Sequence, residues 1–267
     1  PHLFAGANGV YRVSPPLPPE ASVVLSCGYL SKRYPFFVFS RTGGASIIAH
    51  TAHQINEEIH DKEVRLISAQ GEQLGIMPMA EAMAKATYDH FGRIDGLVNN
   101  AALQKQWMLD EYPIKDYDLL MHVNLGGYIN MMRAVLPYLK ETRGSITCIS
   151  SVHGKRPTDF DPVYAMTKGG MHMLLREAAI EFAKYGVRVN MIMPAGVKIE
   201  FKTGNPRPFQ KPRLMPPREY YEKYPMYPLG RHGLPEDSGW ACVYLASQEA
   251  EHISGTCLRA DGCSMLL

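Results

Sequence analysis

Short runs of apolar and β-branched residues alternate with longer stretches in which apolar residues recur at helical spacing, from about residue 60 to the C-terminus. A short apolar run predicts a strand, and a 3.6-residue period predicts a helix. The expected strands span 64–68, 95–99, 145–150, 187–193 and 256–259, and the expected helices span 79–91, 116–140, 163–185 and 235–247. Because strands and helices take turns along the chain, we predict an α/β fold built around a parallel sheet.

Between Lys198 and Arg231 the sequence shows neither short apolar runs nor apolar residues at helical spacing. This segment holds seven of the 20 prolines, and eight basic against three acidic side chains. Long irregular segments within compact domains are usually functional. We predict that residues 198–231 form a lid over a substrate site; the alternative is a proline-rich surface excursion without ligand contact.

Length and composition favour one globular domain over residues 1–267. Of the 267 residues, 46% are hydrophobic and 20% are charged, which is typical of a folded chain with a large core. The formal net charge of +2 is too small to indicate nucleic acid as a partner. We therefore expect a small molecule or a protein as the partner.

The cysteines and histidines do not form a recognisable metal site. The five cysteines include no C-x-x-C pair, and their odd number fits neither a disulfide framework nor zinc. His50, His53 and His60 lack a partner carboxylate, so we expect surface histidines and no metal. No run of about 18 apolar residues and no signal-peptide pattern is present. A cytoplasmic protein without a membrane segment is expected.

Tyr164 and Lys168 lie four residues apart in an expected helix, which puts a phenol and an ammonium on one face. A phenol has a pKa near about 10 and needs a nearby positive charge to act as a base at neutral pH. Alone the pair is weak evidence, because this spacing also occurs in solvated helices. Three more polar residues strengthen it: Asn99 and Ser151 lie at the ends of expected strands, and Asn124 lies in the helix between them.

With their neighbours, these residues resemble the short-chain dehydrogenase/reductase family. The matching segments, in the family's order and spacing, are Gly96–Ala102, His122–Asn124, Ile149–Ser151, Tyr164–Lys168, Arg188–Asn190 with Pro194, and Pro228–Asp237. The resemblance covers roughly three quarters of the chain. It implies a Rossmann-like, doubly wound parallel sheet of about seven strands with helices on both faces. It also implies a homotetramer in which the helices at 116–140 and 163–185 pack against symmetry mates. The Met-rich apolar faces of these helices fit such an interface, and core packing within one subunit would explain them equally well; the methionines are Met131, Met132, Met171 and Met173.

The resemblance assigns a role to each catalytic candidate. Tyr164 is expected to exchange a proton with the substrate oxygen, while Lys168 lowers the pKa of the phenol and bonds the nicotinamide ribose. Ser151 is expected to donate a hydrogen bond to the same oxygen, and Asn124 to position a water that relays protons to Lys168. These roles agree with the chemistry, since hydride transfer at a carbon needs an acid-base group and a donor at its oxygen.

The resemblance also implies contacts with NAD or NADP beyond those of Tyr164 and Lys168. Asn100 and Ala101 are expected beside the adenosine ribose, and Pro194 and Val197 beside the carboxamide. The family's usual Pro-Gly is Pro194-Ala195 here. Because Ala adopts positive φ less readily than Gly, a slightly different nicotinamide pocket is expected.

The glycine motif that should open the fold is degenerate. By spacing, Gly28 is the best candidate for the pyrophosphate loop, because it follows an expected strand at 22–26 and leaves room for a second at 46–50. Thr42–Ser46 is closer by letters, and an error in the first 45 or so residues would have the same appearance. No acid follows the second strand, whereas Arg41 and His53 are near, so NADP is slightly favoured over NAD.

We therefore predict an NAD(P)-dependent oxidoreductase that interconverts a secondary alcohol and a ketone. The charge of the lid, with His153 and Arg156 after Ser151, favours a polar substrate such as a sugar, polyol or sugar acid. The alternative is a binding or regulatory protein on the same fold that holds a dinucleotide poorly, as the degenerate glycine loop would predict.

Overall fold

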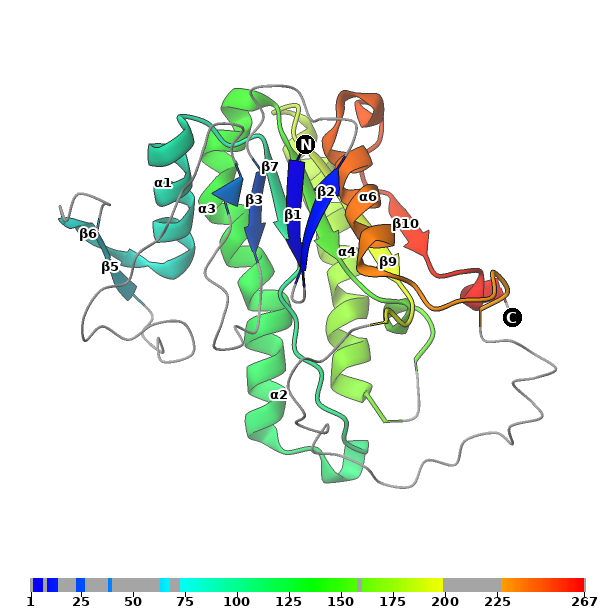
Figure 1. Ribbon diagram of the computed structural model, residues 1–267. Helices are drawn as coiled ribbons and strands as arrows, with labels where there is room; N and C mark the ends of the chain where they lie inside the picture. Colours follow the sequence, from blue (N-terminus) through cyan, green and yellow to red (C-terminus); the bar gives the residue numbers. More distant parts are fainter. Residues whose placement is uncertain are drawn as a thin grey trace.

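The computed structural model describes residues 2–6, 9–13, 23–26, 38–39, 63–67, 73–157, 160–198 and 227–266. A six-stranded sheet forms its centre, in the order β10-β9-β8-β7-β3-β4 (Figure 1). The bounds of these strands are β3 Val23–Ser26, β4 Val38–Phe39, β7 Gly96–Asn99, β8 Ser145–Ile149, β9 Arg188–Pro194 and β10 Cys257–Ala260. All neighbours from β3 to β10 run parallel, which confirms the predicted sheet, and β4 pairs antiparallel with β3.

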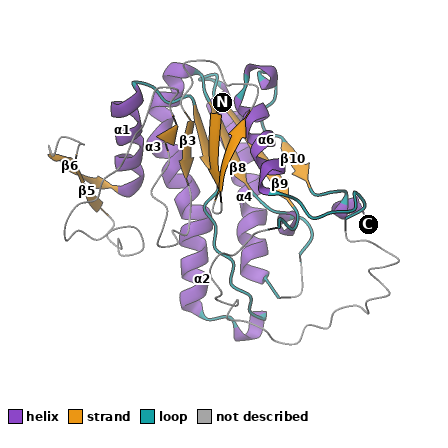
Figure 2. Cartoon of the chain, in the orientation of Figure 1, coloured by secondary structure: helices purple, strands orange, loops and turns teal. Residues whose placement is uncertain are grey.

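Helices lie on both faces of this sheet, as predicted (Figure 2). The long helices are α1 Met79–Phe91, α2 Ile114–Met121, α3 Gly127–Thr142, α4 Pro162–Ala183 and α6 Pro235–Ala246. The short turns are η2 Leu109–Glu111, η4 Val152–Gly154, η5 Gln248–Ala250 and η6 Ser264–Leu266. A π-helical turn, η3 His122–Gly126, joins α2 to α3, so the helix expected over 116–140 is interrupted at residues 122–126.

Alternate residues of each strand enter separate cores, because side chains in a strand point to opposite faces. On β7, Leu97 packs into the core below α1, α3 and α4, whereas Val98 packs into the core that includes residues of α6. Met191 and Ile192 divide in the same way on β9. The central strands are therefore apolar on both sides, as buried parallel strands must be.

The strand expected at 64–68 is present but does not join the central sheet. It is β5, Glu63–Ile67, and it pairs antiparallel with β6, Gln73–Pro78, in a two-stranded sheet of its own. A short connection allows an antiparallel hairpin, whereas a parallel pair needs a crossover of a dozen or more residues. A second hairpin, which the sequence did not predict, joins β1 His2–Gly6 to β2 Gly9–Val13. In the described part of the chain the central sheet has six strands.

The first strand of the expected dinucleotide unit is confirmed. It is β3, which pairs in parallel with β7 so that Ser26 lies opposite Asn99. Gly28, the alternative loop Thr42–Ser46, the expected strand at 46–50 and most of the expected lid, 199–226, lie outside the described residues.

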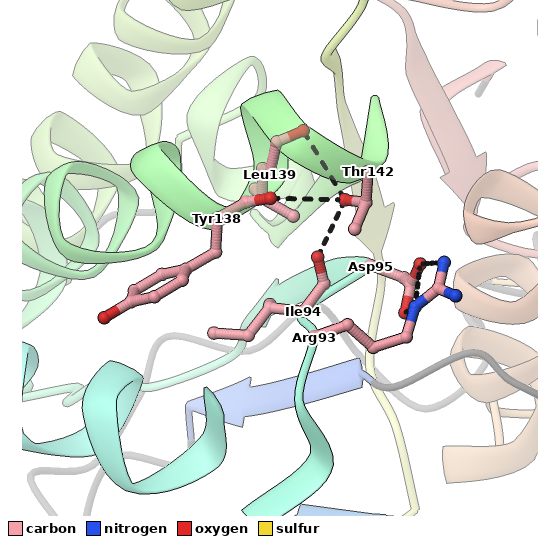
Figure 3. A network of polar contacts seen from close by, with 6 residues as sticks. All are labelled: Arg93, Ile94, Asp95, Tyr138, Leu139 and Thr142. Carbon is pink, nitrogen blue, oxygen red and sulfur yellow. Dashed lines mark hydrogen bonds and ion pairs between the residues drawn. The ribbon is translucent and has the colours of Figure 1, made fainter. Parts of the chain in front are cut away.

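The amino end of the central sheet is tied to the end of α3. Thr142 Oγ1 donates a hydrogen bond to the Ile94 carbonyl at 2.8 Å, and the Arg93 guanidinium pairs with Asp95 at 2.6 Å (Figure 3). Because β7 starts at Gly96, these bonds lie at the opposite end of the strand from Asn99.

Only some of the predicted interface residues remain exposed. Met131, Met132 and Met171 are at most 5% exposed and pack into the subunit's own core. Met173 is 56% exposed, and it shares α4 with Met166 and Ile180, which are 46% and 73% exposed. These three residues follow one another at seven-residue spacing, which makes an exposed apolar stripe along α4.

In the part of the chain with described placement, no helix is long and apolar enough to cross a bilayer. The same residues contain no cluster of three or more potential metal ligands.

Candidate active site

The four catalytic candidates converge at the carboxyl ends of the parallel strands. Ser151 lies two residues beyond β8, Tyr164 and Lys168 lie in the first two turns of α4, and Asn124 lies in η3. Ser151 is 9% exposed, Lys168 1% and Asn124 0%. The helix spacing that brought Tyr164 and Lys168 together in the sequence is therefore confirmed, and folding adds the other two residues.

Burial is the main influence on the Tyr164 phenol. It raises the pKa of Tyr164, while a hydrogen bond with Ser151 lowers it and the negative charge of Asp161 raises it further. The Lys168 ammonium lies 5.6 Å from the centroid of the Tyr164 ring. Because its pKa is raised, Tyr164 is protonated at neutral pH, and the lowering of the phenol pKa expected from Lys168 stays a prediction.

Lys168 is held by the end of β8. Its Nζ donates to the Ile149 carbonyl at 2.8 Å, and burial lowers its pKa to about 8. At neutral pH the side chain is thus mainly an ammonium. An ammonium carries three N–H donors, so two remain beyond the Ile149 bond within the described part of the chain.

Asn124 connects the loop after β7 to α4. Its Oδ1 accepts from the Leu103 backbone N–H at 2.7 Å, and its Nδ2 donates to the Leu103 carbonyl at 2.9 Å and to Thr167 Oγ1 at 3.1 Å. Both amide hydrogens are therefore used within the protein. This positions Asn124 as a bridge, and the water relay expected of it stays a prediction.

The π-helical turn explains how Asn124 reaches this position. An i→i+5 turn accommodates one more residue than an α-helical turn, and such turns are frequent at functional sites. Here it places a fully buried polar side chain between Leu103 and Thr167.

Two polar residues that the sequence analysis missed, the buried Asp161 and the exposed Gln104, form a pair near Tyr164. Asp161 is fully buried directly before α4, and Gln104 Nε2 donates a hydrogen bond to its carboxylate. The signal that could have identified Asp161 is an acid immediately before the Pro that starts a helix. The contact with Gln104 spans 57 positions in the sequence and leaves no local pattern.

The two polar residues proposed to face a substrate take different positions. The His153 ring meets the Tyr164 ring edge-on, with centroids 5.7 Å apart, so His153 does lie beside the catalytic phenol. Arg156 instead donates to the Ser264 carbonyl at 2.9 Å, which ties the loop after Ser151 to the C-terminal turn.

Four of the residues expected to contact NAD(P), two of them beside the adenosine ribose and two beside the carboxamide, lie at this edge of the sheet. Asn100 and Ala101 directly follow β7, Pro194 ends β9, and Val197 forms a bridge with Gly233. Ala195 has no positive φ, so the replacement of the usual Gly imposes no backbone strain. Lys168, with two donors remaining, would hold the ribose hydroxyls. Gly28, the pyrophosphate candidate, lies outside the described residues.

Comparisons with known proteins agree with this arrangement. The family model described as Enoyl-(Acyl carrier protein) reductase matches residues 76–263. The 3-oxoacyl-acyl-carrier-protein reductase FabG of Thermotoga maritima is 32% identical over 173 residues, which span 64% of this chain and 66% of that protein. L-rhamnose 1-dehydrogenase (NAD(P)(+)) of a Sphingomonas species is 29% identical over 227 residues, 82% of this chain and 86% of that protein.

A solved structure shows the same fold. The ligand-free aldohexose dehydrogenase of Thermoplasma acidophilum superposes with a TM-score of 0.60 at 26% identity, over 70% of this chain and 74% of that one. The similarity in three dimensions therefore agrees with the similarity in sequence.

The segment before the dehydrogenase match has a second likeness. A family model for the N-terminal domain of translation initiation factor IF-3 matches residues 55–91, which include β5, β6 and α1. The match to the model described as Enoyl-(Acyl carrier protein) reductase, called here the dehydrogenase match, starts only at residue 76, near the end of β6. The β5–β6 hairpin thus precedes the dehydrogenase match almost entirely, which agrees with its separation from the central sheet. Since the dehydrogenase model matches well over half of the residues, the chain belongs to the short-chain dehydrogenase/reductase family of alcohol and ketone oxidoreductases.

Proposed function

We propose that the chain interconverts a secondary alcohol and a ketone with NADP or NAD, using Ser151, Tyr164 and Lys168. The observation that carries the proposal is the placement of two buried groups beside the half-buried Tyr164: Ser151, two residues after β8, hydrogen bonds with the phenol, and Lys168 Nζ lies 5.6 Å from the centroid of its ring. When bound, the reduced coenzyme supplies a hydride to the carbonyl carbon and the oxidised coenzyme accepts one.

The protein's own groups handle the substrate oxygen. In reduction, Tyr164 is protonated because burial raises its pKa, so its hydroxyl gives a proton to the ketone oxygen as the carbon is reduced. Ser151 donates a hydrogen bond to the same oxygen and stabilises the charge that develops there. The Lys168 ammonium, 5.6 Å from the phenol ring, stabilises the phenolate that is left. In oxidation the same proton returns to Tyr164.

Replacement of Tyr164 tests the proposal. We expect Tyr164→Phe to lower kcat at least about 100-fold, since a general acid contributes that much or more, and to leave coenzyme affinity largely intact. The matched control is Tyr138→Phe, because Tyr138 packs against Tyr88 at 4.7 Å on α3, away from the site. Retention of turnover by Tyr164→Phe would refute the assigned role.

Coenzyme binding separates this proposal from the alternative of a binding or regulatory protein. Titration with NADH and NADPH, followed by fluorescence, should show binding of at least one coenzyme, with NADPH favoured. Arg41 and His53, on which the preference rests, lie outside the described residues. If neither coenzyme binds, the enzyme proposal fails.

A sugar, polyol or sugar acid is the proposed substrate. His153 beside Tyr164 and the Asp161–Gln104 pair supply polar groups near the phenol, and two relatives are named for rhamnose and aldohexose. A substrate panel should therefore include both sugars, a polyol, and a 3-oxoacyl thioester because of the Thermotoga relative. Preference for the thioester would contradict the proposal.

The domain, lid, location and assembly also remain proposals. We propose a single domain over 1–267 with a lid at 198–231, in the cytoplasm. For a homotetramer, the α4 stripe of Met166, Met173 and Ile180 supplies an apolar contact surface. Light scattering should then give about four times the subunit mass of 29.9 kDa, and Met173→Glu should reduce it. A wild-type mass near that of one subunit would rule the tetramer out.

A further inference from the structure

Three consecutive residues at the end of β8 are fastened to α4. The Ile149 carbonyl accepts from Lys168 Nζ at 2.8 Å, Ser150 Oγ lies 2.9 Å from His172 Nε2, and Ser151 forms the hydrogen bond with Tyr164. On α4 the partners follow at four-residue intervals, which places all three on one helix face. Two of the three contacts belong to the proposed catalytic groups, and the third involves His172.

We propose that His172 is a positioning residue, which fixes the end of β8 against α4 and so sets the placement of Lys168 and Ser151. The inference rests on the proposed function, since these are the groups whose placement it sets.

The bond between His172 and Ser150 is well protected. His172 is 6% exposed and Ser150 is 4% exposed, so water does not compete freely for either group. Ser150 Oγ also donates to the Lys168 carbonyl at 3.4 Å. At 2.9 Å the hydroxyl and Nε2 share one hydrogen bond, and the tautomer of the imidazole decides which of the two groups donates.

The backbone leaves room for the ring by means of a glycine. A Cβ on Gly154 would come within 2.8 Å of the Lys168 carbonyl oxygen and 3.0 Å of His172 Nε2. The turn that carries Ser151 therefore approaches α4 at the level of Lys168 and His172, and the imidazole fills the space beside it. This makes the ring a part of the interface between turn and helix.

The charges around His172 keep it neutral. Burial lowers the pKa of His172, and so do the nearby positive charges of Lys155, Arg176 and Lys168. Lys155 follows η4, and Arg176 and Lys168 lie one turn to either side on α4. A neutral ring can hold the contact with Ser150 in either tautomer, as donor or as acceptor at Nε2.

Two substitutions of His172 separate positioning from simple packing. His172→Leu keeps much of the volume and removes the hydrogen bond, whereas the amide of His172→Gln can offer either a donor N–H or an acceptor oxygen in a similar place. We expect the Leu variant to lose about 10-fold or more in kcat, with the KM for coenzyme within about threefold, because small displacements of catalytic groups reduce turnover strongly. The Gln variant should retain kcat within about threefold of wild type.

The pH profile gives a readout that packing alone would not change. If Lys168 moves away from Tyr164, the phenolate loses a nearby positive charge, so the apparent pKa of the catalytic phenol should rise in the Leu variant and not in the Gln variant. Thr142→Val is the matched control, because it removes a side-chain hydrogen bond of 2.8 Å at the opposite end of the sheet (Figure 3). It should lower the melting temperature and leave kcat and the pH profile unchanged.

A measurement on the protein without substrate or coenzyme tests the role of His172 independently of turnover. The pKa of Lys168, which burial lowers to about 8, can be followed by NMR of Cε-labelled lysine and assigned with Lys168→Arg. Without the bond between Ser150 and His172, the Ile149 carbonyl is expected to move away from the Lys168 ammonium, which then loses an acceptor. The pKa of Lys168 should therefore fall in His172→Leu and in Ser150→Ala. The double variant should show no further change in this pKa, since both substitutions remove the same hydrogen bond.

The outcomes distinguish this inference from the proposed function. An unchanged Lys168 pKa in His172→Leu, or wild-type kcat and pH profile in that variant, overturns the positioning role. Absence of wild-type turnover, or its retention in Tyr164→Phe, counts against the proposed function alone, because the NMR titration still tests His172.

Discussion

Gly154 offers the most direct test of the close contact between the turn after β8 and helix α4. In Gly154→Ala, the new Cβ would lie 2.8 Å from the Lys168 carbonyl oxygen and 2.9 Å from its carbon. Ordinary contact begins at 3.4 Å, so the turn must move away by about 0.6 Å, the difference between 3.4 and 2.8 Å. Both contacted atoms are backbone, so no flexible side chain can rotate to relieve the overlap.

The displacement should affect both stability and turnover. Overpacking of a close-packed interface costs about 1–3 kcal/mol, which corresponds to a fall in melting temperature of roughly 2–4 °C per kcal/mol for a chain of this size. Ser151 lies three residues before Gly154, and the carbonyl of Ser151 accepts from the Gly154 N–H at 3.1 Å. Because misplacement by about 1 Å can cost about 100-fold in rate, we expect kcat to fall about 10-fold or more.

Thermal denaturation and steady-state kinetics check this prediction together. The control is Gly239→Ala in α6, where a Cβ meets nothing within 4 Å. There Ala should be neutral or stabilise by about 0.5–1 kcal/mol, since it is the better helix former. Wild-type melting temperature and kcat in Gly154→Ala would refute the steric argument.

Three further predictions concern other buried features. Burial lowers the pKa of Lys168 to about 8, below the value of 10.5 expected in the unfolded chain. Below pH 8 the buried ammonium therefore lowers the free energy of unfolding, and this destabilisation disappears as the pH rises from about 8 to 10.5. Lys168→Met should therefore abolish turnover yet stabilise the fold by about 1–3 kcal/mol at pH 7. Between about pH 8 and 10.5 its melting temperature should depend less on pH than that of wild type, and a destabilised Met variant would contradict this. Asn190→Leu should cost about 2–4 kcal/mol in urea denaturation, because Asn190 bonds the Ile253 carbonyl at 2.7 Å and the Thr256 N–H at 3.1 Å, and both would be left without this partner. Gly144→Ala should destabilise more than Gly154→Ala and spare kcat per folded molecule, since its Cβ would overlap the Asp95 carbonyl oxygen at the amino end of the sheet; equal stability of the two variants would count against it.

The parts of the site that the sequence predicts are those with local spacing. Tyr164 and Lys168 share a helix face because they are four residues apart, and Ser151 follows a short β-branched run that could only be a strand. Long-range contacts have no such signature. Ser150 and His172 meet across 22 positions, and their pairing depends on how closely η4 packs against α4.

The fold, like the site, has features that local sequence patterns predict and features that depend on long-range contacts. Apolar alternation located β5, but the pattern does not specify a partner, so its pairing with β6 outside the central sheet was not predicted. Helical periodicity likewise located the Met-rich faces without saying which side meets the sheet. Met171 packs into the core at 0% exposure, whereas Met173, two residues later and about 200° around the helix, is 56% exposed.

The docking of β8 on α4 also limits how the chain length can vary. Each additional residue in a helix rotates the following side chains by about 100° and advances them by about 1.5 Å. An insertion between Lys168 and His172 would therefore carry His172 off the face that meets Ser150, and one between Tyr164 and Lys168 would separate the phenol from the ammonium. Homologues that keep all three contacts should tolerate substitutions between the contact positions of this nine-residue stretch of α4, and no change in its length.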